Sequence, residues 1–222
     1  MKGNVNQSIH TLLKRLNIQD NDIVILNVSN DVDKGLLKSI LENLKTSLIN
    51  GTLCIIGDCG FNSSETNLEE LSTIPELNRN VIFRKPILKM FELSTSVQYV
   101  KHPSVEIAVS GKHASFLTRH ESLDFPYGKN SIFNDLYDMN AIYLSIGEEE
   151  GAYPLKYAIL EDDAIIKRNV CLYGDIQHSY LDVEFDKDQA ADQFKGNTQY
   201  EGNSPVVYGE RYRYLIEAIR NK

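Results

Sequence analysis

Two short apolar runs separated by a helical repeat constrain the fold of this chain most strongly. The runs span residues 23–28 (IVILNV) and 52–56 (TLCII), and Asn50-Gly51 precedes the second. Short, continuously apolar runs are typical of strands buried on both faces of a sheet. Between them apolar residues recur at helical spacing: Leu36, Leu37, Ile40, Leu41, Leu44 and Leu48. The pattern predicts a β-α-β unit with parallel strands and a right-handed crossover.

The rest of the sequence continues to alternate between strand and helix patterns. Strands are expected at 97–100, 105–109, 141–147 and 180–185, and a hairpin from 155–160 and 164–173 turning at 161–163. Helices are expected from Ser8, from Pro86 to residue 93, at 113–119, from Ser131, at 187–194 and at 208–220. Residues 58–80 are polar and predict a long surface excursion. No linker divides the 222 residues, so we expect one α/β domain over 1–222.

Charge and missing motifs argue against several classes of function. A formal net charge of −8 disfavours a nucleic-acid partner; it suits a cationic substrate, or serves solubility alone. The sequence lacks a phosphate loop, a dinucleotide fingerprint, a nucleophile elbow and a His-Glu-x-x-His motif. Three cysteines without a two-residue spacing, plus five scattered histidines, do not assemble a zinc site. We expect no bound metal.

The sequence also favours a cytoplasmic protein that does not contact membranes. No apolar run approaches the roughly 20 residues that span a bilayer. The first eight residues, MKGNVNQS, lack the apolar core of a signal peptide. An odd, sparse set of cysteines fits a reducing compartment.

Three polar features could carry chemistry. His102 precedes a proline, so its backbone is held extended at a strand entrance, where the ring could act as a base near neutral pH. Alternatively, it bonds only a loop carbonyl. The acidic run at 148–150 could bind an ammonium group or form a solvated loop. The acidic run at 161–163 could hold a metal cation or simply form a turn.

Several short motifs make the chain similar to a known family. HPSVE at 102–106 is followed by Ala108 and Gly111, FPYGKNSI spans 125–132, and an apolar strand then ends in Gly147. Earlier, NVS at 27–29 and GTL at 51–53 continue the pattern. In these motifs the chain resembles the aminoglycoside 3-N-acetyltransferases, which carry His-Pro-x-x-Ser, Thr-Pro-Phe-Gly-x-x-Ser-Pro, His-Ser-Ser and Gly-Thr-Leu segments and use acetyl-CoA.

The resemblance implies a fold, a reaction and a set of site residues. The fold would be a single-domain α/β/α layered sandwich around a mixed, largely parallel central sheet. The reaction would be N-acetylation of an amino sugar or aminoglycoside-like acceptor, as in antibiotic resistance, with acetyl-CoA as co-substrate and a homodimer possible. The implied catalytic residues are His102, Glu106, Glu149 and Lys156. The implied cofactor-binding residues are Asn27, Ser29, Ser104, Pro126, Tyr127, Gly128 and Ser131.

Some positions depart from the family pattern. Lys156 stands where the family has the histidine of its Thr-Ser-x-His segment, and Asn27 replaces the histidine of His-Ser-Ser. A lysine ammonium with a reference pKa of about 10.4 accepts no proton at neutral pH unless burial lowers that pKa. The alternative is therefore a catalytically inactive relative that acts as a binding or regulatory subunit.

Overall fold

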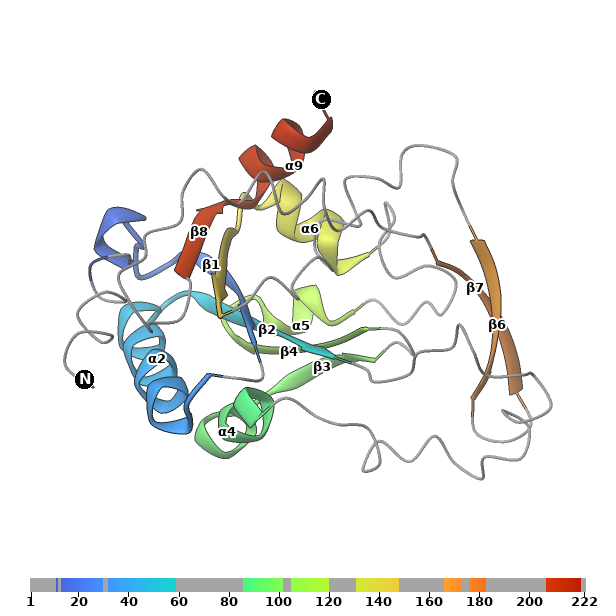
Figure 1. The fold of residues 1–222 in the computed structure, drawn as a ribbon, viewed down its shortest axis with the longest axis horizontal. Coiled ribbons are helices and arrows are strands. Elements are labelled where there is room, and N and C mark those ends of the chain that lie inside the picture. The colour runs from blue at the N-terminus through green and yellow to red at the C-terminus, as the bar shows by residue number, and fades with distance from the viewer. Residues whose placement is uncertain are drawn as a thin grey trace.

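A six-stranded mixed sheet forms the centre of the protein (Figure 1). The computed structural model describes residues 11, 13–29, 32–58, 86–101, 105–119, 131–147, 166–172, 176–182 and 207–220. The sheet strands are β1 (Ile23–Val28), β2 (Thr52–Asp58), β3 (Gln98–Lys101), β4 (Val105–Gly111), β5 (Ile142–Ile146) and β8 (Val207–Arg211). The helices are α2 (Lys34–Ser47), α4 (Pro86–Ser94), α5 (Ala114–Leu117), α6 (Ile132–Asp138) and α9 (Tyr212–Arg220).

Strand order explains why the sheet is mixed. The order is β3-β4-β2-β1-β5-β8. Strand β1 pairs in parallel with β2 and with β5, while β2–β4, β3–β4 and β5–β8 are antiparallel. The predicted parallel β-α-β unit is thus confirmed, as is the mixed sheet. Parallel pairing is confined to the three central strands, so the sheet is less parallel than expected.

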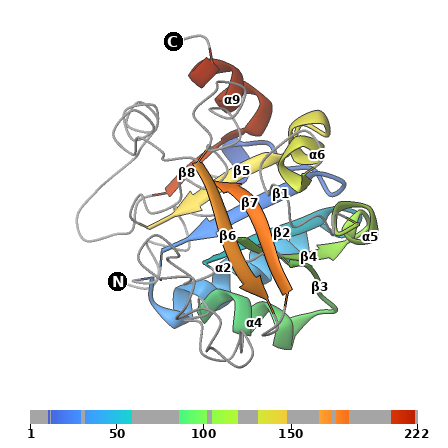
Figure 2. The ribbon, with the colours of Figure 1, turned by 90° about the vertical axis from the view of Figure 1, so that its right-hand side faces the viewer.

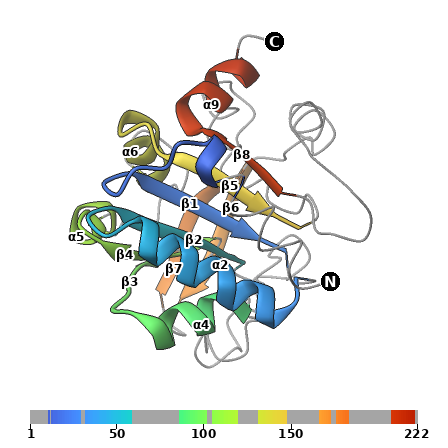
Figure 3. The same cartoon turned by 90° about the vertical axis from the view of Figure 1, so that its left-hand side faces the viewer.

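Helices cover both faces of the sheet. Helices α2 and α4 lie on one face, and α5, α6 and α9 lie on the other (Figures 1 and 3). Alternate residues of β1 supply the two cores: Val24, Leu26 and Val28 pack with α2 and α4, whereas Ile23 and Ile25 pack with α5, α6 and α9. This two-sided burial is the reason why every residue of the run at 23–28 except Asn27 is apolar. The layered α/β/α order is confirmed.

Two elements near the C-terminus differ from the prediction. Residues 207–211 form strand β8 rather than helix, and α9 begins only at Tyr212, because pairing with β5 extends the chain as far as Arg211. The strand expected at 180–185 begins earlier, at Ile176, and of the hairpin expected from 155–160 and 164–173 only residues 166–172 are described. These form strand β6 (Ile166–Leu172), which pairs antiparallel with β7 (Ile176–Asp182). The predicted segments 58–80 beyond Asp58, 155–160 and 187–194 lie outside the described residues.

The β6–β7 pair forms a separate two-stranded sheet. It lies on the side of the molecule opposite α2, and it crosses in front of the central sheet when that side faces the viewer (Figure 2). Across the described helices, none combines the length and the apolar character that crossing a membrane requires.

Candidate functional site

Buried polar side chains gather where the central parallel strands end. Four polar residues are buried among those described, and two of them, Asn27 and Ser29, lie at the carboxyl end of β1. Asn27 is 2% exposed and Ser29 is 7% exposed. In α/β proteins, ligands bind outside the carboxyl ends of parallel strands. Burying polar groups is unfavourable unless they are hydrogen-bonded. The buried polar side chains therefore make this end of the sheet the candidate site.

Asn27 reaches across the sheet to strand β5. Its Nδ2 donates to the Tyr143 hydroxyl oxygen at 3.5 Å, and its backbone lies opposite Ser145 in the parallel register. Ser145 also hydrogen-bonds the phenol. Complete burial raises the pKa of Tyr143 from 10.0 to about 12, and these two hydrogen bonds oppose the rise. The phenol therefore stays protonated at neutral pH and can both donate and accept.

Ser29 lies against the end of β5. Its backbone N–H donates to the carbonyl of Ile146 at 2.9 Å. The next residue, Gly147, has φ +101°, and a Cβ added there would collide with the Ser29 Cβ. Glycine is therefore required at 147, both for its positive φ and for the close approach of the two chain segments.

Ser131 begins helix α6, as the sequence predicts. Its hydroxyl accepts from the Asn134 N–H at 3.4 Å, and its side chain is buried, at 3% exposed. A tight turn at 139–141 links α6 to β5, with the Ala141 N–H donating to the Leu136 carbonyl at 3.0 Å. The C-terminal end of α6 therefore lies next to the start of β5.

The predicted site residues divide into those the structure describes and those it does not. Asn27 and Ser29 lie at the carboxyl end of β1, and Ser131 caps helix α6. Glu106 pairs through its backbone with Gly57 near the carboxyl end of β2. The other candidates lie outside the described residues: His102, Ser104, Pro126, Tyr127, Gly128, Glu149 and Lys156.

Some described residues adjoin, in the sequence, the candidates that are not described, and they lie at this same end of the sheet. Lys101 closes β3 and Val105 opens β4, and Val105 pairs with Asp58, the last residue of β2. Gly147 follows the last residue of β5. Chain segments far apart in sequence thus start or stop together beside Asn27.

Sequence reasoning missed Tyr143 and Ser145. Tyr143 and Ser145 alternate with apolar residues in β5, and this alternation was the available signal that both face the same side as Asn27. Among the described residues, no cluster of three or more His, Cys, Asp or Glu side chains could hold a metal ion.

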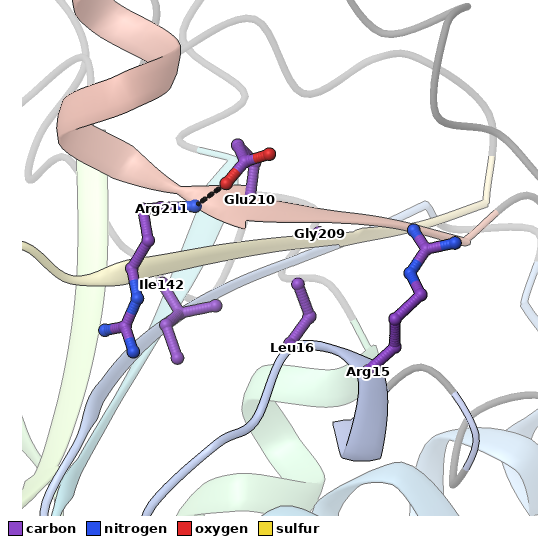
Figure 4. A pocket seen from close by; sticks show the side chains of 6 residues that line it. All are labelled: Arg15, Leu16, Ile142, Gly209, Glu210 and Arg211. Carbon is purple, nitrogen blue, oxygen red and sulfur yellow. Dashed lines mark hydrogen bonds between the residues drawn. The ribbon is translucent and has the colours of Figure 1, made fainter.

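A pocket of about 310 Å³ lies at the other end of the sheet. Its lining includes Ile142, the first residue of β5, and Arg211, the last residue of β8. Figure 4 shows Arg15 and Arg211 on opposite sides, with Leu16 and Ile142 between them. Arg211 Nη1 already binds Asp22 Oδ1 at 3.1 Å and the Asn140 carbonyl at 3.2 Å. This pocket is therefore distinct from the polar cluster around Asn27, and no sequence motif indicated it.

Comparison with known proteins supports the resemblance. The sequence profile of a family described as aminoglycoside 3-N-acetyltransferase matches residues 87–152. The solved structure of the YokD protein from Bacillus subtilis is similar, with a TM-score of 0.75 and 17% identity over 98% of this chain and 92% of that one. No curated protein matches the sequence.

Two further solved structures carry ligands. Sisomicin-bound AAC-VIa has a TM-score of 0.73 and 13% identity, over 97% of this chain and 96% of that one. The binary complex of AAC-IIIb with CoASH has a TM-score of 0.73 and 14% identity, over 98% and 95%. The predicted family resemblance and fold are confirmed, and the low identities mark the chain as diverged.

Proposed function

We propose that the chain is an acetyl-CoA-dependent N-acetyltransferase that acts on the amino group of an amino sugar or aminoglycoside-like acceptor. The observation that carries the proposal is the position of Asn27 and Ser29, buried polar residues at the carboxyl end of β1. Both belong to the NVS motif of the resemblance, and Ser131, which caps α6, belongs to a second motif. The profile match over 87–152 and the ligands of the similar structures, sisomicin and CoASH, support the same reaction class.

In this proposal the cofactor-binding residues hold the thioester at the carboxyl ends of β1 and β5. Asn27, Ser29, Ser104 and Ser131 offer amide and hydroxyl groups, and residues 126–128 supply the loop before α6. Amide and hydroxyl side chains suit the amides and phosphates of CoA, since they both donate and accept hydrogen bonds. Fixing the thioester beside the acceptor makes the reaction effectively unimolecular.

The transfer itself needs a base and an oxyanion donor. His102, assisted by Glu106 or Glu149, takes a proton from the acceptor ammonium, and the freed amine attacks the thioester carbonyl. A backbone N–H or the Lys156 ammonium stabilises the resulting oxyanion. Collapse of the tetrahedral intermediate breaks the C–S bond, leaving an amide and the CoA thiol once a proton returns to sulfur. Each step uses a residue that the resemblance already places in the site.

A second candidate function rests on Lys156. Because this lysine replaces a family histidine, the chain could keep the binding site without the chemistry and act as a binding or regulatory subunit. This alternative predicts CoA binding without turnover. It also predicts that Lys156→His restores part of the activity.

Calorimetric titration with acetyl-CoA and CoA tests the proposal first. We expect micromolar dissociation constants, followed by release of CoA thiol when amino sugars or aminoglycosides are added. His102→Ala should abolish thiol release while leaving CoA binding within about twofold, because a base contributes to the chemical step. Absence of binding at millimolar CoA would refute the acetyltransferase and point to a protein partner instead, and binding without turnover of any acceptor would favour the second candidate.

A further inference from the structure

A tyrosine hydroxyl lies inside the apolar core beside the candidate site. Tyr143 is fully buried and packs with Ile25, Phe133 and Leu136 between the sheet and α6. Phenylalanine would fill nearly the same volume and would bring no polar atom into the core. A buried hydroxyl is unfavourable unless it is hydrogen-bonded, so the Tyr143 hydroxyl is explained by its partners rather than by packing.

Those partners lie at the carboxyl ends of β1 and β5. The phenol oxygen accepts from Asn27 Nδ2 at 3.5 Å and also hydrogen-bonds Ser145, which lies opposite Asn27 in the register. The ring of Tyr143 therefore leans along β5 toward its carboxyl end. Asn27 and Tyr143 are 116 residues apart in the sequence, so only the parallel β1–β5 pairing brings them together.

An asparagine amide has two different faces, one donor and one acceptor, and its rotation decides which of them a ligand meets. The Tyr143 hydroxyl holds the Nδ2 side of Asn27. We propose that Tyr143 is a positioning residue, which fixes the rotation of the Asn27 amide so that this amide meets the amide-bearing pantetheine arm of CoA in one orientation. This inference rests on the proposed function, because it takes Asn27 as a cofactor-binding residue.

Tyr212 offers a matched control. It is also a fully buried tyrosine in the same apolar cluster, but its N–H donates to the Ala141 carbonyl at 2.7 Å, near the amino end of β5. Tyr143→Phe and Tyr212→Phe remove the same atom from equally buried rings of one core cluster, and it is the Tyr143 hydroxyl that Asn27 contacts. A loss of CoA affinity caused by general loosening of the core would affect both variants.

The experiment measures CoA affinity by calorimetry for the wild-type chain, Tyr143→Phe, Tyr212→Phe, Asn27→Ala and the Tyr143→Phe/Asn27→Ala double variant. We expect Tyr143→Phe to weaken binding about tenfold and Tyr212→Phe to leave it within about twofold. Once Asn27 is gone, Tyr143→Phe should have no further effect, because a positioning residue acts through the residue it positions. Thermal unfolding should show that both phenylalanine variants fold.

Three outcomes would overturn the inference. Unchanged CoA affinity in Tyr143→Phe would show that the hydroxyl does not position Asn27, while leaving the proposed function standing. Additive effects in the double variant would assign Tyr143 a separate role. Failure of the wild-type chain to bind CoA would remove the inference together with the proposed function, and this result differs from the first two.

Discussion

Gly147 and Ser29 approach each other more closely than any side chain at position 147 would permit. We expect Gly147→Ala to lower the free energy of unfolding by about 1–3 kcal/mol, because the alanine must adopt a positive φ and displace Ser29. The same displacement should weaken CoA binding at least about tenfold. Urea unfolding and calorimetry measure the two effects separately.

Gly111 provides the control for that variant. It also has a positive φ, +119°, and a Cβ there would meet the Gly51 carbonyl oxygen at the opposite end of β2. Gly111→Ala should be destabilised to a similar extent while keeping its CoA affinity. Equal losses of affinity in both variants would mean that strain anywhere in the sheet impairs binding, and Ser29 would lose its assigned role.

Burial of Tyr143 predicts a pH dependence of stability. The folded-state pKa of about 12 lies above the unfolded value of 10.0 because burial disfavours the phenolate. Between these values the unfolded chain releases the proton while the folded protein keeps it, so the free energy of unfolding falls as pH rises through this window. Relative to Tyr143→Phe, the wild-type chain should lose about 1 kcal/mol between about pH 9 and about pH 11 in urea unfolding. Parallel pH profiles for the two proteins would contradict the assignment.

Individual site residues were predictable only where a motif carried them. Asn27, Ser29 and Ser131 stand in the motifs of the resemblance, and the structure buries all three, the first two at the carboxyl end of β1. Tyr143 was not predictable, because a tyrosine in an apolar run indicates only a core position. Its significance depends on the residue opposite it in the sheet, and register is a property of the folded chain.

Among the elements, α5 and α6 are joined by one arginine. Arg119 follows α5, and its guanidinium contacts Asp135 of α6 through two bonds, at 2.6 and 3.0 Å. It also lies 3.7 Å from the centre of the Phe116 ring. Forked arginine–carboxylate contacts are stronger than single ones, and Asp135 is mostly buried, at 13% exposed. The contact holds in place the helix that begins at Ser131.

We expect Arg119→Ala to lower the free energy of unfolding by about 1 kcal/mol, and Arg119→Lys to recover little of it, since an ammonium cannot form the fork. The control is Lys38→Ala. Its partner, Glu42, lies 3.8 Å away on the exposed face of α2, where such pairs contribute roughly 0.3–0.5 kcal/mol. Urea unfolding compares the three variants, and an Arg119→Ala variant as stable as Lys38→Ala would argue against the α5–α6 link.

Secondary structure was predictable where apolar periodicity is strong. The sequence places β1 at its observed bounds, and α2, β2, α4 and β5 close to theirs, because their burial patterns are unambiguous. Strand β8 was wrongly predicted as helix. Its five residues, VYGER, mix apolar and charged types, and pairing with β5 rather than local propensity decides their conformation.

For the whole molecule, the strand order predicts an order of local stability. Strand β1 is buried along its whole length between β2 and β5, whereas β3 and β8 lie at the edges of the described sheet. In hydrogen-exchange mass spectrometry we expect amides of β1, β2 and β5 to exchange only through global unfolding, and those of β3 and β8 to exchange faster. Uniform protection across the sheet would contradict this gradient.

The pairing of β1 with β5 has a consequence for how the protein is made. Their contact joins residues 116 positions apart. At a translation rate of about 5–20 residues per second, β5 follows β1 out of the ribosome after roughly 6–23 s. During that interval one edge of β1 is an open template of backbone donors and acceptors. The nascent chain is therefore most prone to strand mispairing before β5 pairs with β1.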